Sequence, residues 1–466
     1  MKTMKKISLY ISAIAVAGVL LFATSCKKDF YTKANVNPNQ PSNVPPNTLL
    51  PGIEVSLAYA QGGDASRYAS EFIQQGYGAA REAASDYSYE ITGTNLPEQL
   101  WDNMYAADME NDYTLLNMAN SNGYNEYAGI ANILMAYSLQ VTVDFWGSVP
   151  YSQAFQGAAN INPAYDPDQT IYGDIITLLN TGISDLQKPN PGVLVPTTDD
   201  VIYGGKAASW IAFANAIKAR IYIHQCKHST PAMCTNAFAA ADSALSEGFS
   251  NAQVTFPGVP NSNPNYQYIA GWGDITYVTS GGVHATMYDT MVAISDPRIP
   301  VYFDSTGAAT ASTPIVGMNT ATSYYAQPTS PVELITKEEL DFIEAEATLR
   351  SGGTVAAAEV YYANAINDNF AKLGIGSSAA AYIVANPLPA TNAQAQYVLG
   401  KQEWIALFMN PEAWACWRRT GAPSLIPVVA GDQVPRRMVL PNSEITENSN
   451  APQGETLWSP LIFWDK

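Results

Sequence analysis

The fold is decided by the stretch 336–373, TKEELDFIEAEATLRSGGTVAAAEVYYANAINDNFAKL. Thr336 and, three residues later, Glu339 have the spacing of a capping box, which predicts the start of a helix. The pattern predicts one helix over 340–350, a turn at the paired glycines, and a second helix over about 355–373. Small side chains that let the two helices approach closely are the alanines at positions 345, 347, 358 and 365.

Helical patterns of the same kind extend outward from this pair. Three earlier regions predict hairpins: 100–120, which could pair with the helix before it; a helix from Glu126 that turns at 146–151; and 207–225 with 237–245. The pair at 340–373 resembles a tetratricopeptide hairpin, but the spacings between the four hairpins are unequal. We therefore predict an all-α fold without a uniform repeat.

The remaining segments are less regular. Residues of about 248–335 are rich in Asn, Pro, Gly, Ser, Thr and Tyr and predict a long loop insertion between the third and fourth hairpins. Long irregular loops on a regular frame usually carry binding function. A further helix is predicted over 395–409, with a short one after Pro411 and a loop-rich tail from Pro435.

The N-terminus predicts export. Three lysines precede an apolar run from Ile7 to Phe22, and small residues lead directly to Cys26. This order is typical of a secretory signal, and the placement of Cys26 resembles a lipoprotein signal in which that cysteine is acylated. We predict a signal peptide over 1–25, an Asn- and Pro-rich tether over 26–51, and a single domain over 52–466. Acyl chains would anchor the protein to a membrane without a spanning helix.

The composition limits the partners. Loss of residues 1–25 removes three lysines and no acid, so the formal charge falls from −18 to −21. Such an acidic chain repels phosphate backbones, and nucleic acid is therefore excluded as a partner. Hydrophobic residues make up 47% and charged residues 14%, which allows a large core and argues against disorder.

Three cysteines follow Cys26. Cys226 and Cys234 flank a predicted turn between helices, and an exported chain could close that turn with a disulfide or keep two thiols. Cys416 lies between tryptophans and is predicted to be a buried, small apolar group.

A family resemblance is carried by blocks that occur in one order along the chain. They are Asp144–Tyr151 (DFWGSVPY), Tyr165-Asp166 with Ile171-Tyr172, Asp200–Gly205 with Trp210–Asn215, Glu344–Ala347, Gln402–Gly421 with its Arg418-Arg419-Thr420-Gly421 ending, and Pro435–Glu444. Each block is weak evidence on its own. Together they resemble the SusD/RagB type of nutrient-binding lipoprotein, with departures at Cys416 and Leu440.

The resemblance implies an all-α fold of four tetratricopeptide-like hairpins in a right-handed scaffold, with loop insertions forming the binding face. It implies a binding protein without cofactor or catalytic residues, lipid-anchored in the outer membrane and facing the cell exterior. The implied partner is a SusC-like TonB-dependent transporter, on which the lipoprotein acts as a hinged lid. Ligands in the family are mostly oligosaccharides; peptides are the alternative, and a surface glycosidase is a third hypothesis.

Aromatic residues in predicted loops are the candidate ligand contacts, because sugars have apolar faces that stack on aromatic rings and hydroxyl groups at their edges. Trp272, between two glycines, is the best predicted platform. Tyr87 and Tyr89 form a second group, and the pair Tyr324-Tyr325 a third. The neighbours of Trp272 that share its predicted role are Asn265, Tyr266, Tyr268 and Asp274.

The sequence gives weaker evidence for a metal site or for catalytic residues. His224 and His228 have a metal-ligand spacing but no helical carboxylate partner, so surface or capping histidines are predicted and no metal site. The glutamates at 338, 339, 344 and 346 could form a glycosidase pair, but a solvated helix face is the favoured interpretation. No EF-hand spacing for calcium is present.

Overall fold

The computed structural model describes residues 44–78, 81–91, 97–190, 192–227, 231–259, 262–271, 275–276, 286–303 and 323–466. The chain divides into two compact units, Met1–Pro45 and Pro46–Lys466, and all helices and strands named below belong to the second. The predicted signal peptide and Cys26 lie outside the described residues.

The second unit starts with helix α3, Pro46–Ala60. It therefore begins inside the segment 26–51 that the sequence predicted as a tether. Pro46 occupies the first turn, where the missing backbone N–H would have no helical partner anyway. Pro51 lies within the helix, although a proline usually marks a helix boundary.

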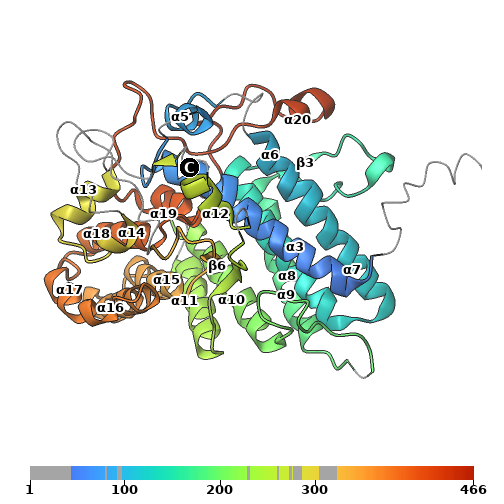
Figure 1. The fold of residues 1–466 in the computed structure, drawn as a ribbon, viewed down its shortest axis with the longest axis horizontal. Helices are drawn as coiled ribbons and strands as arrows, with labels where there is room; N and C mark the ends of the chain where they lie inside the picture. The colour runs from blue at the N-terminus through green and yellow to red at the C-terminus, as the bar shows by residue number, and fades with distance from the viewer. Residues whose placement is uncertain are drawn as a thin grey trace, which may run out of the picture. The chain divides into compact units, whose positions relative to one another are not determined.

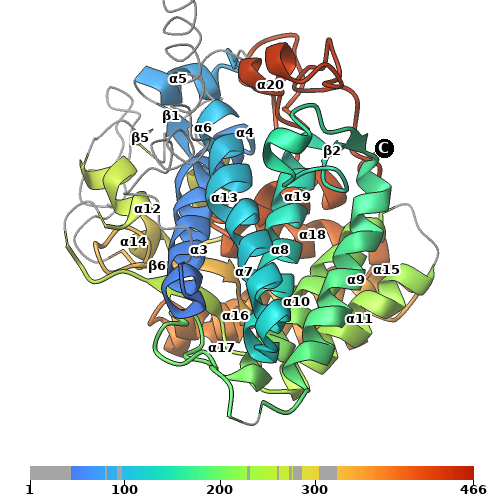
Figure 2. The ribbon, with the colours of Figure 1, turned by 90° about the vertical axis from the view of Figure 1, so that its right-hand side faces the viewer.

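The predicted helical hairpins are confirmed. Figure 1 shows them following one another across the lower half of the unit, from right to left. The pairs are α8 (Asn125–Trp146) with α9 (Asp168–Leu186), α10 (Ala207–Gln225) with α11 (Pro231–Ser246), and α15 (Lys337–Arg350) with α16 (Val355–Lys372). Figure 2 shows α7 to α11 side by side as one layer of long helices.

Two further groups of helices flank these pairs. One continuous helical run packs against α3 and leads into α8; it consists of α6 (Pro97–Asp102), the π-helix η2 (Asn103–Met109) and α7 (Glu110–Asn122). At the other end, α18 (Asn392–Ala406) packs on α15, and α19 (Glu412–Thr420) follows it. Within the described ranges, none of the helices combines the length and hydropathy needed to cross a bilayer.

Small residues let the helices of a pair approach closely. A Cβ added to Gly129 of α8 would lie 2.6 Å from Leu186 and 2.9 Å from the Gly182 carbonyl oxygen of α9. A Cβ added to Gly182 would in turn lie 2.9 Å from the Gly129 carbonyl oxygen. Any side chain here would push the two backbones apart and open the close-packed interior.

Helix α15 corrects two predictions. Its glutamates are buried rather than solvated, with exposures of 1% for Glu338, 0% for Glu339, 4% for Glu344 and 1% for Glu346. Thr336 stands at the N-cap without a side-chain cap hydrogen bond. The Glu339 carboxylate is instead bound by Arg220 of α10, with N–O distances of 2.7 and 2.8 Å, and cannot complete a capping box.

The opposite side of the unit is built from short elements. Within the described ranges, three two-stranded antiparallel ribbons are formed by β1 (Tyr77–Gly78) with β5 (Ile275–Thr276), β2 (Val149–Pro150) with β3 (Tyr165–Asp166), and β4 (Ala252–Thr255) with β6 (Pro331–Ile335). The last ribbon joins the two ends of the predicted insertion. Described helices within the insertion are short: α12 (Pro264–Tyr266), the π-helix η4 (Gln267–Gly271), α13 (Thr286–Ala293) and α14 (Ile299–Tyr302).

The two cysteines at the α10–α11 turn are joined. Cys226 and Cys234 form a disulfide, with their Cα atoms 5.3 Å apart. Cys416 is a free, fully buried thiol.

Candidate functional site

A pocket of about 380 Å³ lies where the insertion meets the first helices of the unit. Its walls come from α3, from the π-helix η1 (Gln61–Ala65), from the run α6–η2, and from α12–η4. The residues that line it are Ser56, Tyr59, Gly63, Asp64, Gln99, Asn103, Pro264, Gln267 and Tyr268. Figure 1 shows α3, α6 and α12 converging near the centre of the unit.

Three π-helical segments meet at this pocket. Asp64 belongs to η1, Asn103 to η2, and Gln267 and Tyr268 to η4. In η1 the backbone of Gly63 leaves the helical region, with φ −92° and ψ −110°. π-Helical turns are rare and frequent at functional sites, because each turn re-aims side chains relative to a regular helix. Their convergence marks this pocket more strongly than its size does.

The centre of the pocket is an aromatic side chain held by charged groups. The Tyr268 hydroxyl donates to Asp64 Oδ1 at 2.8 Å. The Arg67 guanidinium lies 3.2 Å from the same carboxylate oxygen and 5.2 Å from the centre of the Tyr268 ring. Tyr268 is therefore fixed in orientation by a hydrogen bond and a cation–π contact, as a binding platform must be.

Further carboxylate groups lie close to Arg67. Arg67 lies 3.5 Å from the carboxylate of Asp86 and 3.6 Å from that of Glu82. Burial raises the pKa of Asp86 to about 7, against the lowering effect of the Arg67 charge. The Arg67 guanidinium thus lies within 3.6 Å of the carboxyl groups of Asp64, Asp86 and Glu82.

Amide and hydroxyl groups complete the lining. Gln99 donates to the side-chain oxygen of Asn103 at 3.0 Å, and Gln267 donates to the Tyr59 hydroxyl at 3.3 Å. Tyr59 is 36% exposed, so its ring also faces outward. Aromatic rings combined with amides and a carboxylate suit a ligand that has both apolar faces and many hydroxyl groups.

The residues predicted from sequence have different surroundings. Tyr268 lines the pocket, while its neighbour Tyr266 is half-buried beside the pocket and is absent from its lining. Asn265 is 3% exposed, and its side-chain oxygen has no hydrogen-bond partner among the described residues. Trp272 and Asp274 lie outside the described residues.

The second and third predicted groups are packed inside the protein. Tyr87 is 2% and Tyr89 7% exposed; the Tyr89 hydroxyl accepts from the backbone N–H of Val428 at 3.2 Å. Tyr324 donates to Glu333 at 2.9 Å, and Tyr325 is 3% exposed. None of these four tyrosines lines the pocket around Tyr268.

His224 corrects another prediction, because it is fully buried rather than a surface or capping residue. Its Nε2 lies 2.7 Å from Glu412 Oε1, and its Nδ1 lies 2.9 Å from the Tyr172 hydroxyl and 3.5 Å from Asp144 Oδ2. Burial opposes its charge, but the carboxylates of Glu412 and Asp144 outweigh burial and raise the pKa of His224 to about 9. His228 lies outside the described residues.

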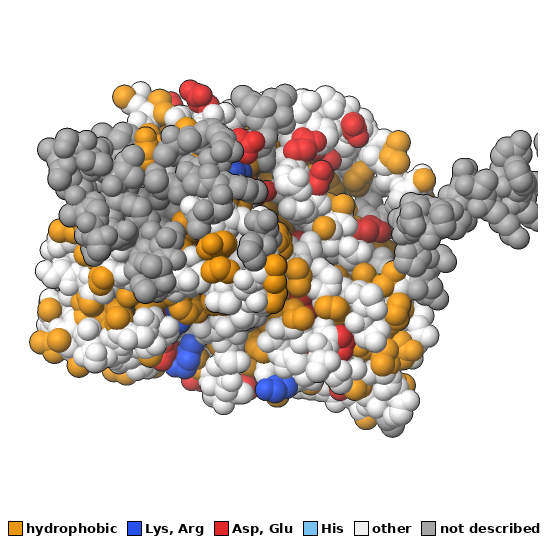
Figure 3. Space-filling view, in the orientation of Figure 1, with side chains coloured by type: hydrophobic (Ala, Val, Ile, Leu, Met, Phe, Trp, Pro, Cys, Tyr) orange, Lys and Arg blue, Asp and Glu red, His pale blue; other side chains and the backbone are white. Residues whose placement is uncertain are grey.

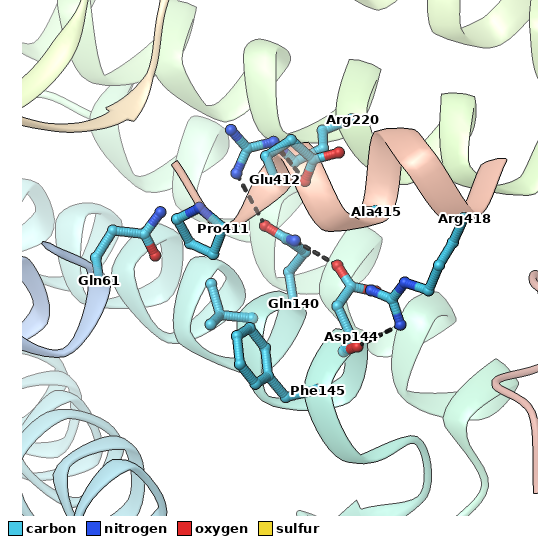
Figure 4. A pocket seen from close by; sticks show the side chains of 10 residues that line it. Gln61, Gln140, Asp144, Phe145, Arg220, Pro411, Glu412, Ala415 and Arg418 are labelled. Carbon is cyan, nitrogen blue, oxygen red and sulfur yellow. Dashed lines mark hydrogen bonds and ion pairs between the residues drawn. The ribbon is translucent and has the colours of Figure 1, made fainter. Parts of the chain in front are cut away.

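The ligand atoms of Asp144, His224 and Glu412 lie within 4.8 Å of one another, a spacing that could hold a metal ion. Both ring nitrogens of His224, however, are already hydrogen-bonded. Figure 4 shows Gln140 between Arg220 and Asp144: Arg220 donates to the Gln140 side-chain oxygen at 3.2 Å, and Gln140 donates to the Asp144 carboxylate. Arg418 donates to the main-chain carbonyl oxygen of Asp144 at 2.8 Å. The small cavity beside them, about 10 Å³, has room for about one water. The arrangement is a buried ion-pair network that joins α8, α10 and α19.

The fold is a frame of helical hairpins, and a pocket of aromatic, hydroxyl and amide groups lies among its first helices. This combination is typical of a helical solute-binding protein. The chain belongs to the SusD-like family: the model described as "Starch-binding associating with outer membrane" matches residues 38–441. Members of this family are outer-membrane nutrient-binding proteins rather than enzymes.

Solved structures support the fold. A chitin-binding protein is 22% identical with a TM-score of 0.73, covering 91% of this chain and 100% of its own. A SusD/RagB family protein from Bacteroides thetaiotaomicron is 20% identical with a TM-score of 0.73, at 91% and 99% coverage. A chitin-binding SusD homolog from Flavobacterium johnsoniae is 24% identical with a TM-score of 0.69, at 85% and 93% coverage. No curated protein matches the chain.

Proposed function

We propose that this chain is a cell-surface lipoprotein that captures a neutral oligosaccharide in the pocket around Tyr268 and delivers it to a TonB-dependent outer-membrane transporter. The observation that carries the proposal is the fixed Tyr268 ring beside a carboxylate and three amides. A pyranose ring can stack on the aromatic face while its hydroxyl groups bond to Asp64, Gln99 and Asn103.

The charge of the pocket selects against acidic sugars. Among the described residues, no lysine or arginine lines it, and Arg67 behind it is already paired with carboxylates. A uronic acid or a sulfated sugar would bring a second negative charge towards Asp64 without a free cation to compensate. Neutral or amine-bearing glycans are therefore the expected ligands.

The proposed lipid anchor is supported by the N-terminal signal, and the proposed transporter by the outer-membrane association in the family's description. Acylation of Cys26 would hold the folded unit at the membrane surface through the segment that precedes α3. A binding protein without a catalytic group needs a partner that moves the captured sugar across the membrane, and a SusC-like transporter is that partner in this proposal.

The test is calorimetry of the purified mature chain with chitohexaose, chosen because two similar structures are named as chitin-binding, followed by a glycan and peptide array. Tyr268→Ala is expected to weaken binding by about 1–3 kcal/mol, roughly 5- to 150-fold, as for a buried aromatic anchor. Tyr397→Ala is the matched control, because Tyr397 is 39% exposed on α18, outside the pocket.

Three results would contradict the proposal. They are binding of peptides but of no glycan, release of shortened products from a polysaccharide, and equal losses for Tyr268→Ala and the control variant.

A further inference from the structure

A second pocket, of about 330 Å³, lies beside the same helical run α6–η2. Its other walls come from the segment around β2 and η3 (Gly157–Ala159) and from α20 (Asn442–Glu447). The residues that line it are Trp101, Tyr105, Ala106, Glu110, Pro150, Ala154, Phe155, Gln156, Gly157, Asn160, Pro163 and Glu444. The first pocket shares none of them.

The two pockets lie on two sides of one helix. Gln99 and Asn103 line the first pocket, whereas Trp101 and Tyr105, each two residues further on, line the second. A shift of two residues turns a side chain by roughly 200° around a helix, to nearly the opposite face. The helix, roughly 10–12 Å across with its side chains, is therefore a common wall between the pockets.

A row of aromatic rings forms the inner surface of the second pocket. The ring centres of Trp101 and Tyr105 are 4.6 Å apart, those of Tyr105 and Phe155 are 6.4 Å apart, and those of Phe155 and Tyr113 are 5.6 Å apart. Successive planes are inclined by 33°, 31° and 27°. Tyr113, at the end of the row, is 40% exposed, so the row runs from the interior to the surface.

The loop that carries Phe155 is held in place. Phe155 has φ +60°, a conformation that residues other than glycine adopt rarely and that marks functional sites. The Tyr105 hydroxyl donates to the Pro150 carbonyl oxygen at 2.8 Å. The Asp166 carboxylate accepts from the backbone N–H groups of Tyr151 and Ser152 at 2.9 and 2.7 Å. The pocket is therefore formed before any ligand binds.

The rim is polar and acidic. Glu110 and Glu444 supply carboxylates, and Gln156 and Asn160 supply amides; among the described residues, no lysine or arginine lines the pocket. Figure 3 shows acidic side chains over the upper right of this face, with most basic side chains in view near the lower edge. Like the first pocket, the second one suits a neutral or amine-bearing group with hydroxyls better than an anion or a purely apolar side chain.

We infer that the second pocket is a further sugar subsite, which binds a distal residue of the glycan chain held at Tyr268, on the other side of the α6–η2 helix. This inference rests on the proposed function. A chain long enough to cross the helix gains a second contact within one molecule, so its affinity exceeds that of a short oligomer bound at one pocket.

The test compares chitobiose, chitotetraose and chitohexaose by calorimetry. Phe155→Asn removes the ring but keeps a residue that tolerates the positive φ, and Glu110→Gln removes a rim charge. Each variant is expected to weaken hexaose binding at least about 5-fold, with biose binding at Tyr268 unchanged. Ile161→Asn is the matched control, because Ile161 is in the same loop, 74% exposed and outside the pocket lining. Thermal unfolding checks that each variant is folded.

The outcomes separate the two proposals. If Tyr268→Ala weakens hexaose binding while Phe155→Asn and Glu110→Gln behave like Ile161→Asn, the subsite is rejected and the proposed function stands. If the wild-type chain binds no glycan, the proposed function is rejected and the subsite with it. If Phe155→Asn abolishes binding of a peptide from the array but not of the hexaose, the pocket serves a protein partner and the inference is wrong.

Discussion

The buried network around His224 and the pocket around Tyr268 both contain carboxylate, amide and tyrosine side chains, but they differ in exposure and in charge pairing. In the network, Arg220, Glu412 and Asp144 are at most 5% exposed and each charge meets an opposite one. In the pocket, Tyr59 and Tyr268 keep part of their surface open, and the polar groups are amides, hydroxyls and a single carboxylate. The paired charges of the network hold the helices together, whereas the partly exposed side chains of the pocket can contact a solute.

The largest effect on stability is expected from disrupting the buried ion-pair network around His224. Arg220→Met removes the guanidinium that binds Glu339 at 2.7 Å and lies 3.3 Å from Glu412, and it leaves buried carboxylates without that partner. We expect the free energy of unfolding to fall by about 3–5 kcal/mol, measured by urea denaturation.

The matched control breaks a surface pair. Lys188→Met removes the partner of Asp185, but Lys188 is 52% exposed, so a loss below about 1 kcal/mol is expected. Equal losses for the two variants would show that the buried network contributes no more than an exposed ion pair.

A smaller effect is expected from pH. The folded-state pKa of His224, about 9, lies above its ordinary value of 6.5. The stabilisation is therefore complete below about pH 6.5 and is lost as the pH rises through 9, by up to about 3 kcal/mol. The groups that face the ring are Asp144 on α8, Tyr172 on α9 and Glu412 on α19.

The measurement compares wild type with His224→Gln by urea denaturation between pH 6 and pH 10. The difference in unfolding free energy should shrink as the pH rises, because only the wild type loses a charge at this position. A difference that stays constant over this range would mean that His224 is neutral in the folded protein.

The sequence predicted the frame well because helix boundaries have local signals. Helix α10 covers the predicted 207–225, and α16 covers nearly all of the predicted 355–373. Paired glycines, prolines and alanine spacing act within a few residues, so one chain segment contains the information.

The buried ion pairs that connect the helices could not be predicted in the same way. Glu339 and Arg220 are 119 residues apart in sequence, and Arg419 and Glu346 are 73 apart. On helix α15, glutamates that meet buried arginines have the same spacing as glutamates that face water. His224 likewise shows no local sign of Glu412, 188 residues away.

The residues of the candidate pocket differ in how visible they are in the sequence. Tyr268 was named as a candidate because it lies in an aromatic-rich segment, whereas Asp64, Gln99 and Asn103 lie on helices, where a polar side chain usually faces solvent. Two signals were available in retrospect. Gly62-Gly63 directly precedes Asp64 and permits the kink in η1, and Gln99 and Asn103 stand four residues apart on one helix face.

The smallest effect concerns the aromatic residues that the sequence ranked as ligand contacts. Trp272→Ala is expected to weaken chitohexaose binding by about 1–3 kcal/mol, as for an aromatic platform. Tyr324→Phe is expected to leave binding unchanged, because its hydroxyl donates to Glu333 and the residue lines neither pocket. Calorimetry compares the chitohexaose affinities of the two variants and so distinguishes a structural tyrosine from a tryptophan proposed to contact the ligand. If Tyr324→Phe weakened binding as much as Trp272→Ala, the Tyr324 hydroxyl would take part in ligand binding, and its assignment to the structural part of the protein would be wrong.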